Sequence, residues 1–477
     1  MESITAVQFR TRIIAISVLA VGLVLGEKDG GIDLGKHYAF ADGLALSLHK
    51  HGNDCTSALG VSMMISLLYP GSNEETSEQI FDVLGFSSED QGQLFWKDTI
   101  DALLATYDGK CTSEYKGECF SKPPLVEVAN SIWTDSGLQL IQSYHDIVDE
   151  YALQANFDDE GAGAIINSWV EESTHGLIDK IIENGPIAKD VSLVAVNSIY
   201  LNATWANPFR EEYTNADYFY SSADQVAGSE TIAQFMHMVD EFPYSHDALP
   251  GIQLIELNFL RGLSMLVALP IRNKVGSVTS SDILMAFPQL NKTRVALALP
   301  KFQFVAEYEK DLMFALKSLG IKAAFDDEKG FCTMFNDNKC GYISLVKQKT
   351  FIKVYEKGTE AAAVTTGQVG ITSMPFDPPD APIMFMSDHP FQFFIYDRNS
   401  KLILFEGLVS APGIPKDSSH ADMTSKHTED NFWLANFRAE PTIITVASDG
   451  VPFFICSLRF LVHTVFASFA SVLFNLY

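Results

Sequence analysis

The segment EKGTEAAAVTTGQVGITSM, residues 356 to 374, restricts the folds open to this chain more than any other stretch. A strand-like run leads into it, and its own side chains are mostly small and uncharged. Gly358 gives the backbone freedom at the point where the preceding strand ends. The segment is too apolar for a solvated linker and anchors poorly in a core. It therefore suits two structures, an exposed loop and a strand within a sheet.

Alternation of side chains along a strand decides whether this segment could enter a sheet. One face would carry small, uncharged residues: Thr359, Ala361, Ala363 and Thr365. The other face would carry a set that tolerates partial exposure: Glu360, Ala362 and Val364. Such a strand could pack over helices in the middle of a sheet without steric clashes. A mobile loop of small residues, with no second structure, is the alternative.

Charge and the N-terminus indicate the compartment. A net charge of −27 argues against nucleic acid and anionic membranes, which bind clustered Lys and Arg. Arg10 and Arg12 precede an apolar run, IIAISVLAVGLVLG (13–26), which ends in small residues and is short for a membrane span. We interpret residues 1–26 as a signal peptide and expect secretion to the extracellular space. A membrane anchor is the less favoured alternative.

The expected secretion determines how the six cysteines and two N-glycosylation sequons are interpreted. Cys111 with Cys119 and Cys332 with Cys340 are local pairs that could close short disulfide loops, or could be four free thiols. The scattered His residues and the lack of a CxxC pair predict no metal site. N-glycosylation is expected at two sequon residues, Asn202 and Asn291.

Residues 27–412 form one continuous domain in the sequence, with helices concentrated in the first half and strands in the second, which predicts an α+β fold. Apolar periodicity predicts helices over 40–50, 61–69, 76–84, 163–182 and 311–320. Strands are predicted over 193–201, 264–270, 295–304 and 342–356. FQFFIYD and LILFEGLV, within 391–409, are joined by the turn-like RNSK and predict a hairpin.

Residues 413–477 differ in composition, with a polar linker followed by an apolar extension. The extension could be a C-terminal membrane helix, although Arg459 and His463 interrupt it. A lipid-anchor signal and a segment with no part in the fold are the other interpretations. A membrane tether is not favoured.

Enzyme signatures do not occur in this sequence. There is no G-x-S-x-G motif, no HExxH, no Walker A loop and no GxGxxG. Single His and Ser residues are more often structural than catalytic. We therefore expect a protein that is not an enzyme and that uses no cofactor.

Several blocks of sequence resemble those of the serpins, a family of serine protease inhibitors, and occur in the same order. They are NDCTSALGVSMMISLLYPGSNEETSEQI (53–80), VANSIW (128–133), INSWVEESTHGLI (166–178), LVAVNSIYLNATWANPF (193–209), LPKFQF (299–304), KVYEKGTEAAAVTT (353–366), SDHPFQFFI (387–395) and LFEGLV (404–409). The resemblance covers roughly 27 to 412. It implies a serpin fold, in which helices pack around three β-sheets and an exposed reactive loop lies near the C-terminus.

The resemblance also implies site residues. The hinge of the loop would consist of Glu356, Gly358, Thr359, Glu360, Ala361, Ala362, Ala363, Val364 and Thr365. The breach and shutter, where the sheet opens and where polar groups close it, would include Asn53, Ser57, Asn197, Trp205 and His389. Some positions depart from the family pattern: Ala58, Gly60, LNA (201–203), Gln348, Tyr355 and Leu408. We expect these departures to remove donors and acceptors from the polar network that closes the sheet.

By the logic of the family, a serine protease attacks the loop as a substrate and is carried along when the hinge inserts into the sheet. The spacing usual in the family places the reactive bond between Thr372 and Ser373, with Ile371 or Met374 as alternatives. No Lys or Arg occurs between Lys357 and Arg398, which disfavours trypsin-like proteases. The expected target is elastase-like or chymotrypsin-like, with a papain-like cysteine protease as a further option.

Two further expectations concern partners. The acidic stretch around 97 to 120 lacks the basic helix face of heparin-activated serpins, so heparin binding is not expected. We expect a monomer. A non-inhibitory serpin, acting as a carrier, storage or binding protein, is the alternative function.

Overall fold

The structure is a computed structural model of the chain. It describes residues 34–48, 52–86, 113–115, 118–121, 124–188, 191–225, 228–271, 278–326, 330–337, 339–359, 381–412, 442–446 and 453–457. The chain divides into two compact units, Met1–Lys416 and Asp417–Tyr477. Each unit is described by itself.

Three helices near the N-terminus match the helices predicted there: α2 (Leu34–Leu48), α3 (Ala58–Leu68) and α4 (Glu74–Leu84). All residues of α3 are buried, which makes it a core helix. Ser57 caps its N-terminus by accepting a hydrogen bond from the Gly60 amide at 3.0 Å. Gly85, with φ of 77°, ends α4 in the left-handed conformation that favours glycine.

The remaining helices are shorter: α6 (Gln142–Val148), α7 (Ala162–Ser173), α8 (Ser280–Ala286) and α9 (Lys310–Leu319). Short 3-10 helices follow several elements: η1 (Tyr69–Gly71), η2 (Asp149–Tyr151), η3 (Glu211–Tyr213), η4 (Leu260–Gly262), η5 (Phe287–Gln289) and η6 (Ala323–Phe325). The helix predicted over 311–320 is confirmed as α9, which ends before Gly320.

Helix α7 ends earlier than its apolar periodicity predicts. The prediction was 163–182, whereas the helix ends at Ser173 because the next residues turn left-handed. His175 has φ of 54° and Gly176 has φ of 78°. The Gly176 amide donates to the carbonyl of Glu171 at 2.8 Å, as in a Schellman termination. The isoleucines that follow lie on an irregular segment instead of a helix.

A five-stranded sheet holds the middle of the first unit. Its order is β12 (Phe302–Tyr308), β13 (Ile343–Val354), β6 (Leu193–Asn202), β4 (Leu125–Asp135) and β5 (Ala152–Ala155). The pairs β12–β13 and β6–β4 are antiparallel, whereas β13–β6 and β4–β5 are parallel. The predicted strand 295–304 is interrupted at Lys301, so its first part belongs to another sheet.

That other sheet has nine strands. The main path is β1 (Asp54–Thr56), β16 (Ile403–Val409), β15 (Phe391–Asp397), β10 (Leu263–Pro270), β9 (Ile252–Asn258), β8 (Glu230–Leu249), β11 (Asn291–Pro300) and β14 (Ile383–Met386). β7 (Asn215–Tyr220) pairs with β8 off this path. The predicted hairpin of 391–409 is confirmed, since β15 and β16 pair antiparallel. A separate ribbon is formed by β2 (Ser113–Tyr115) and β3 (Glu118–Ser121).

The fold is therefore α+β, as predicted, and nine strands of the first unit are joined in one sheet. The reason is β8, a strand of 20 residues. Its first residues pair with β7, its middle pairs with β11, and its last residues pair with β9. Within the described residues of the first unit, two large sheets thus take the place of the three that the resemblance implies.

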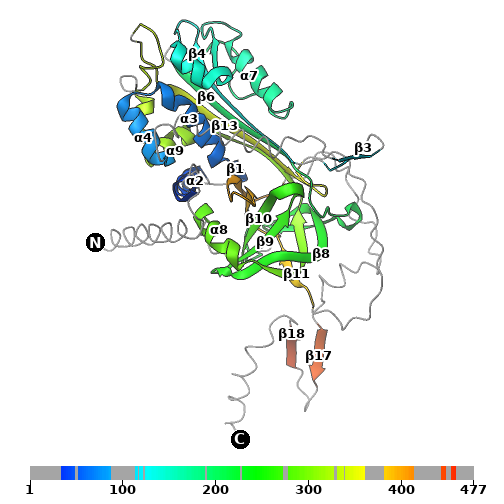
Figure 1. The fold of residues 1–477 in the computed structure, drawn as a ribbon. Coiled ribbons are helices and arrows are strands. Elements are labelled where there is room, and N and C mark those ends of the chain that lie inside the picture. The colour runs from blue at the N-terminus through cyan, green and yellow to red at the C-terminus, as the bar shows by residue number, and fades with distance from the viewer. Residues whose placement is uncertain are drawn as a thin grey trace, which may run out of the picture. The chain divides into compact units, whose positions relative to one another are not determined.

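The helices cover the five-stranded sheet on both faces (Figure 1). α7 lies on one face, where its apolar side packs on β4 and β6. α3 lies on the opposite face and also contacts β16 of the nine-stranded sheet. α8 covers the nine-stranded sheet near α2.

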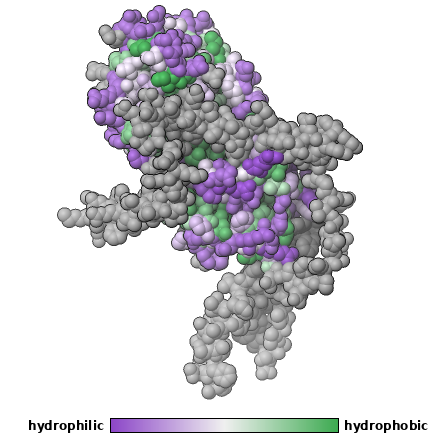
Figure 2. All heavy atoms as spheres, viewed as in Figure 1, coloured by the Kyte–Doolittle hydropathy of each residue, from purple (hydrophilic) through white to green (hydrophobic). Residues whose placement is uncertain are grey.

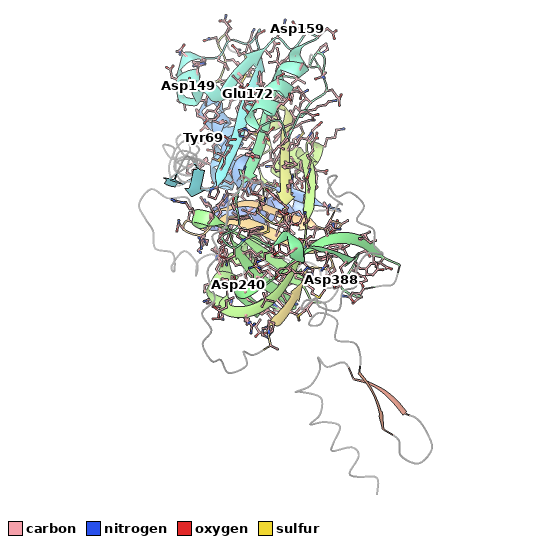
Figure 3. All side chains as sticks on the ribbon, turned by 90° about the vertical axis from the view of Figure 1, so that its right-hand side faces the viewer. Tyr69, Asp149, Asp159, Glu172, Asp240 and Asp388 are labelled. Carbon is pink, nitrogen blue, oxygen red and sulfur yellow. A yellow bond between two sulfur atoms is a disulfide. The ribbon has the colours of Figure 1, made fainter. Side chains whose placement is uncertain are left out.

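The described surface of the first unit is mixed, with hydrophilic residues prominent at the end that carries β4 and α7 (Figure 2). Acidic side chains there include Asp149, Asp159 and Glu172, while Asp240 and Asp388 lie at the other end (Figure 3). None of the helices among the described residues has both the length and the hydropathy of a membrane span.

The second unit contains a two-stranded antiparallel hairpin. It consists of β17 (Thr442–Val446) and β18 (Phe453–Ser457), with Ile444 opposite Ile455. β18 lies within the apolar extension predicted from the sequence, and β17 precedes that extension.

Candidate functional site

The boundary between β6 and β13, which we call the seam, is the centre of the candidate site. The two strands are parallel neighbours, and their register runs from Ile343 opposite Leu193 to Thr350 opposite Ile199. Both strands continue beyond this pairing, β13 to Val354 and β6 to Asn202. The seam is thus closed along most of its length and parted at one end, which we call the hinge end.

A tight turn follows β13 at the hinge end. The Tyr355 amide donates to the carbonyl of Gly358 at 3.0 Å, and the Gly358 amide donates back to Tyr355 at 3.1 Å. Gly358 has φ of 144°, and a Cβ there would collide with the carbonyl oxygen of Ala203. Only glycine fits, and the turn directs the chain back towards the end of β6.

Thr359, the next residue, is already docked against the end of β6. Its amide donates to the Ala203 carbonyl at 2.7 Å, and its Oγ1 accepts from the Ala203 amide at 2.7 Å. Thr359 as a whole is 2% exposed. The predicted hinge therefore begins inside the molecule, directly beyond the last residue of β6.

Trp205 lies beneath the turn. Its indole Nε1 donates to the carbonyl of Tyr355 at 2.9 Å, and its amide donates to the carbonyl of Lys357 at 2.9 Å. The ring stacks on Phe259 with 4.2 Å between ring centroids. This arrangement places Trp205, which the sequence assigns to the breach and shutter, directly against the start of the hinge.

Glu356 is buried at the start of the turn and has partners that the sequence did not single out. Its carboxylate contacts the Lys301 ammonium at 3.0 Å and accepts from the Thr214 hydroxyl at 2.8 Å. Its carbonyl accepts from the Phe209 amide at 2.9 Å. Lys301 occurs in the LPKFQF block, where a charged residue interrupts a strand. This interruption is the sequence feature that could have identified Lys301 as a functional residue.

A chain of side-chain hydrogen bonds crosses the seam on the face towards α3. The Gln348 amide donates from Nε2 to the Ser57 carbonyl at 2.9 Å and to Asn197 Oδ1 at 2.7 Å. Its Oε1 accepts from the Thr56 hydroxyl at 2.6 Å. Asn197 then donates to Asn130 Oδ1 at 2.7 Å. Four strands and the start of α3 are linked by this network.

The expectation that the departures weaken this network is wrong for Gln348. Its amide supplies a donor and an acceptor at once, so it bonds on both sides of the seam. Gly60 has a steric role, because a Cβ there would lie 2.8 Å from Asn197 Oδ1. Leu408 contributes through its backbone, whose amide donates to Asp54 at 2.9 Å.

Two residues expected at the breach and shutter lie elsewhere. Asn53 accepts from the amides of Ser410 and Ala411 at 2.8 and 2.9 Å, and so holds the chain after β16. The His389 ring bonds Asp388 at 2.8 Å and the Pro270 carbonyl at 2.7 Å, at the start of β15. Both residues support the nine-stranded sheet, whereas Ser57, Asn197 and Trp205 belong to the seam.

Buried acids lie near the shutter, around β1 and β16. Burial raises the pKa of Glu406 to about 8, although a hydrogen bond from Ser280 at 2.8 Å opposes this shift. The nearby carboxyls of Asp42 and Asp54 raise it further. Burial also raises the pKa of Asp54 to about 7, against the effect of the Leu408 amide. Among the described residues, Glu406 Oε1 has no hydrogen-bond partner.

The cysteines and sequons fall in different places. Cys332 and Cys340 form a disulfide in the loop before β13, and Cys55 is a buried free thiol on β1. Asn202 is half-buried at the end of β6 and donates to the Tyr200 hydroxyl at 3.2 Å. Asn291 is exposed at the start of β11. Cys111 lies outside the described residues, so its pairing with Cys119 stays a prediction.

Several predicted segments also lie outside the described residues. They are the signal peptide (1–26), the hinge residues Glu360 to Thr365, the reactive bond Thr372–Ser373 and the linker from 413 onwards. Among the residues that are described, no cluster of three or more His, Cys, Asp or Glu side chains could hold a metal ion.

Comparisons with known proteins agree with this geometry. A family described as Serpin (serine protease inhibitor) matches residues 38–412. The chain is 31% identical over 375 residues to an uncharacterised serpin-like protein of Thermococcus kodakarensis, covering 76% of this chain and 82% of that protein. It is 30% identical over 375 residues to serine protease inhibitor 42Dd of Drosophila melanogaster, covering 76% and 92%.

A solved structure with a similar fold is human thyroxine-binding globulin in complex with thyroxine. The TM-score is 0.66 with 22% sequence identity, over 79% of this chain and 98% of that one. At this identity the likeness shows the fold alone.

Proposed function

The chain belongs to the serpin family, and we propose that it is an inhibitory member that traps serine proteases as a suicide substrate. In this proposal a protease cleaves the loop that follows the hinge and forms an acyl-enzyme with it. The loop then enters the seam as a new strand, carrying the protease before water can release it.

The observation that carries this proposal is the parallel pairing of β6 with β13. Because the turn at Tyr355–Gly358 reverses the chain, a strand continuing from Thr359 would run antiparallel to both neighbours. Insertion would replace one parallel pair with two antiparallel pairs, which are slightly more stable per residue. The intact protein would thus hold less than its full number of strand pairs, which supplies a driving force.

The residues that would follow Thr359 into the seam suit both faces of the sheet. One face lies under α7 and the other over α3, so large or charged side chains would clash or be buried unpaired. The small, uncharged residues of AAAVTT (361–366) avoid both costs. This favours an inhibitor over a carrier or storage protein.

The target class follows from residues around the proposed reactive bond, Thr372–Ser373. A pocket that requires Lys or Arg would find none between Lys357 and Arg398. We therefore propose an elastase-like or chymotrypsin-like target, met outside the cell by a secreted, glycosylated monomer that needs no heparin. The apolar run over 13–26 supports secretion.

A panel of pancreatic elastase, chymotrypsin, trypsin and papain tests the proposal. We expect an SDS-resistant complex with elastase or chymotrypsin, and a large rise in the thermal midpoint after the loop is cleaved. Thr372→Arg should redirect inhibition towards trypsin. Cleavage without a complex and without a gain in thermal midpoint would contradict the proposal and favour the non-inhibitory alternative.

A further inference from the structure

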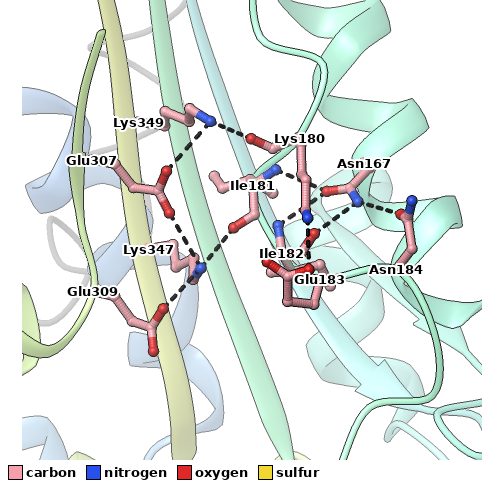
Figure 4. A network of polar contacts seen from close by, with 10 residues as sticks. All are labelled: Asn167, Lys180, Ile181, Ile182, Glu183, Asn184, Glu307, Glu309, Lys347 and Lys349. Carbon is pink, nitrogen blue, oxygen red and sulfur yellow. Dashed lines mark hydrogen bonds and ion pairs between the residues drawn. The ribbon is translucent and has the colours of Figure 1, made fainter.

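The seam is held differently in its middle and at the end opposite the hinge, which we call the far end. In the middle, the Lys347 ammonium of β13 donates to the Ile181 carbonyl at 2.7 Å (Figure 4). At the far end, Ile343 of β13 lies opposite Leu193 of β6. The chain enters β13 there from a segment that we call the disulfide loop, residues 330–337 and 339–341.

A disulfide between Cys332 and Cys340 closes the disulfide loop. The backbone is paired next to this cross-link, because the Phe331 amide donates to the Gly341 carbonyl at 2.8 Å. Phe331 is buried, whereas Cys332 is half-buried and Cys340 is exposed. The disulfide loop therefore has an anchored base and a cross-link that a dissolved reagent can reach.

On one side, the disulfide loop is fastened to the start of α4. Asn73, which precedes α4, accepts from the Cys332 amide at 2.8 Å through Oδ1, and its own amide donates to the Gly330 carbonyl at 3.1 Å. The Thr333 hydroxyl donates to the Ser72 carbonyl at 3.1 Å. Because α4 contacts the core helix α3, this side of the disulfide loop is tied to the interior of the first unit.

On its other side, the disulfide loop is fastened to the chain that follows β4. The Ile141 amide donates to the Met334 carbonyl at 2.9 Å, and the Asn336 amide donates to the Gln139 carbonyl at 2.9 Å. The side chain of Met334 is buried. Because β4 pairs with β6, the disulfide loop leads into one strand of the seam and is bonded to the chain beside the other.

Strand register indicates which part of an inserted loop would reach the far end. Thr359 is docked beside Ala203, and a strand continuing from it antiparallel to β6 would advance one residue for each residue of β6. Leu193 is ten residues before Ala203. Val369 would therefore lie beside Leu193, and Thr372 would lie three residues beyond it.

The same count on the β13 side ends in the disulfide loop. Ile343 lies opposite Leu193, and Cys340 is three residues before Ile343. After insertion, Thr372 would thus be level with Cys340. A protease acylated at Thr372 would be held against the disulfide loop.

We propose that the Cys332–Cys340 disulfide is a redox-sensitive buttress that sets how long a trapped protease stays acylated. The proposal rests on the proposed function, because it concerns the fate of the same acyl-enzyme. Hydrolysis of the acyl bond requires the captured enzyme to regain its catalytic geometry. A cross-linked loop has few alternative conformations and resists that recovery, whereas an open loop yields to it.

Reduction by a dithiol would remove the buttress. One thiolate of the dithiol attacks the exposed Cys340 sulfur, and Cys332 leaves as a thiolate. The second thiol of the reagent then displaces Cys340 and closes the reagent into its own disulfide. Two electrons pass from the dithiol to the protein, and two protons end on the Cys332 and Cys340 sulfurs. The complex would persist in an oxidising fluid and decay in a reducing compartment.

The test compares the wild type with the double variant Cys332→Ser/Cys340→Ser. Each is mixed with elastase and with chymotrypsin, the covalent complex is isolated, and its decay is followed as returning protease activity. We expect complex formation at the wild-type rate and stoichiometry. The half-life of the complex should be about tenfold shorter without the disulfide.

Reduced wild-type protein provides a second form that does not depend on the folding of the double variant. The protein is treated with dithiothreitol, alkylated with iodoacetamide and desalted before the protease is added, so the disulfides of the protease never meet the reductant. Its complex should show the same shortened half-life.

Cys111→Ser/Cys119→Ser is the matched control, since it removes the other predicted pair of cysteines. Its complex should decay at the wild-type rate. Ile283→Val, in a core cluster of the nine-stranded sheet, controls for general loss of stability and should also leave the half-life unchanged.

An unchanged half-life without the disulfide would overturn the proposal, as would an equal shortening in either control. A change confined to the rate or stoichiometry of complex formation would also overturn it, because the disulfide would then act before trapping. If the oxidised wild type forms no complex at all, the proposed function itself fails. In uncleaved protein, loss of the disulfide should speed hydrogen exchange at the Cys332 and Ile141 amides, and unchanged exchange there would reject the buttress alone.

Discussion

The middle of the seam and its hinge end are held in opposite ways. In the middle, backbone pairing between β6 and β13 is reinforced by Gln348 on one face and Lys347 on the other. At the hinge end the strands have parted, and the gap is occupied by the turn of Gly358 and the side chain of Thr359. β6 and β13 are therefore held together in the middle of the seam and already separated at its hinge end.

This difference indicates where opening begins and where it is resisted. A strand entering at Thr359 meets no β6–β13 pairing until Thr350 and Ile199. Beyond that point each further residue must displace backbone hydrogen bonds and the side-chain bridges on both faces. If the loop inserts as proposed, the hinge end would control whether insertion starts, and the middle would control how fast it continues.

The largest expected effect comes from Thr359→Arg, which blocks the hinge end. An arginine there would have to enter a site where the native residue is 2% exposed and its hydroxyl contacts the backbone of Ala203. We expect the rate of covalent complex formation with elastase to fall about a thousandfold, or about 4 kcal/mol. Cleavage of the loop should continue, and stopped-flow with gel analysis measures both.

Thr359→Ser is the control for that variant. The serine hydroxyl can still accept from the Ala203 amide, so inhibition should remain near the wild-type rate. Normal trapping by the arginine variant would show that the hinge end does not control the start of insertion.

Glu406→Gln tests a buried acid outside the seam. The folded pKa of about 8 exceeds the ordinary 4.5. Below pH 4.5 the carboxyl is protonated in both the folded and the unfolded states, and its contribution to the stability of the fold is then fully present. That contribution is lost as the pH rises towards 8. At pH 7 the wild type should be less stable than the glutamine variant by about 3 kcal/mol. Thermal midpoints between pH 5 and 8 measure the difference.

The glutamine variant should gain most at pH 8 and least at pH 5, with residual pH dependence from Asp54. Because Glu406 is not one of the residues bridging β6 and β13, annealing of a synthetic peptide corresponding to Thr359–Thr372 should change little. A strong effect on the rate at which the protein takes up a synthetic loop peptide would mean that general stability sets the rate at which the seam opens. The side-chain bridges between β6 and β13 would then not set that rate.

The smallest effect, a loss of stability, is expected from Gln348→Leu. This substitution removes the hydrogen bonds that Gln348 makes on the face of the seam towards α3. The Ser57 carbonyl and Asn197 would lose their donor, at a cost of about 2 kcal/mol to the intact protein. Thermal unfolding of the uncleaved protein measures this loss. Gln348→His, with one donor and one acceptor, should lose less. Equal losses in both variants would mean that packing, and not hydrogen bonding, explains the role of residue 348.

Much of the fold could be predicted because local pattern and tertiary environment agree. β6 and the β15–β16 hairpin have strongly apolar, β-branched or aromatic sequences that fit only buried strands. α7 was predicted too long because the isoleucines after Gly176 keep a helical spacing while the backbone turns left-handed. The joining of the sheets by β8 depends on strand register, which no local pattern encodes.

The hinge could be predicted from its small residues. The side chains of β13 that form bonds across the seam could not be predicted. Lys347 and Lys349 occur in a strand with alternating character and resemble a solvated face. Lys347 is buried and Lys349 is partly covered only because the chain at Lys180 and Ile181 crosses them, which is a tertiary effect. Gln348 was predicted to weaken the shutter because a missing histidine is visible in sequence, whereas a new pair of bonds is not.

The long strand β8 has a mechanical consequence. It is hydrogen-bonded to β7, β11 and β9 in turn, with a register irregularity between Ser245 and Leu249, so one strand ties three neighbours into one sheet. A protease dragged by the inserting loop would pull against a stiff frame. The work released by insertion would then deform the captured enzyme and would not be dissipated in distortion of its captor.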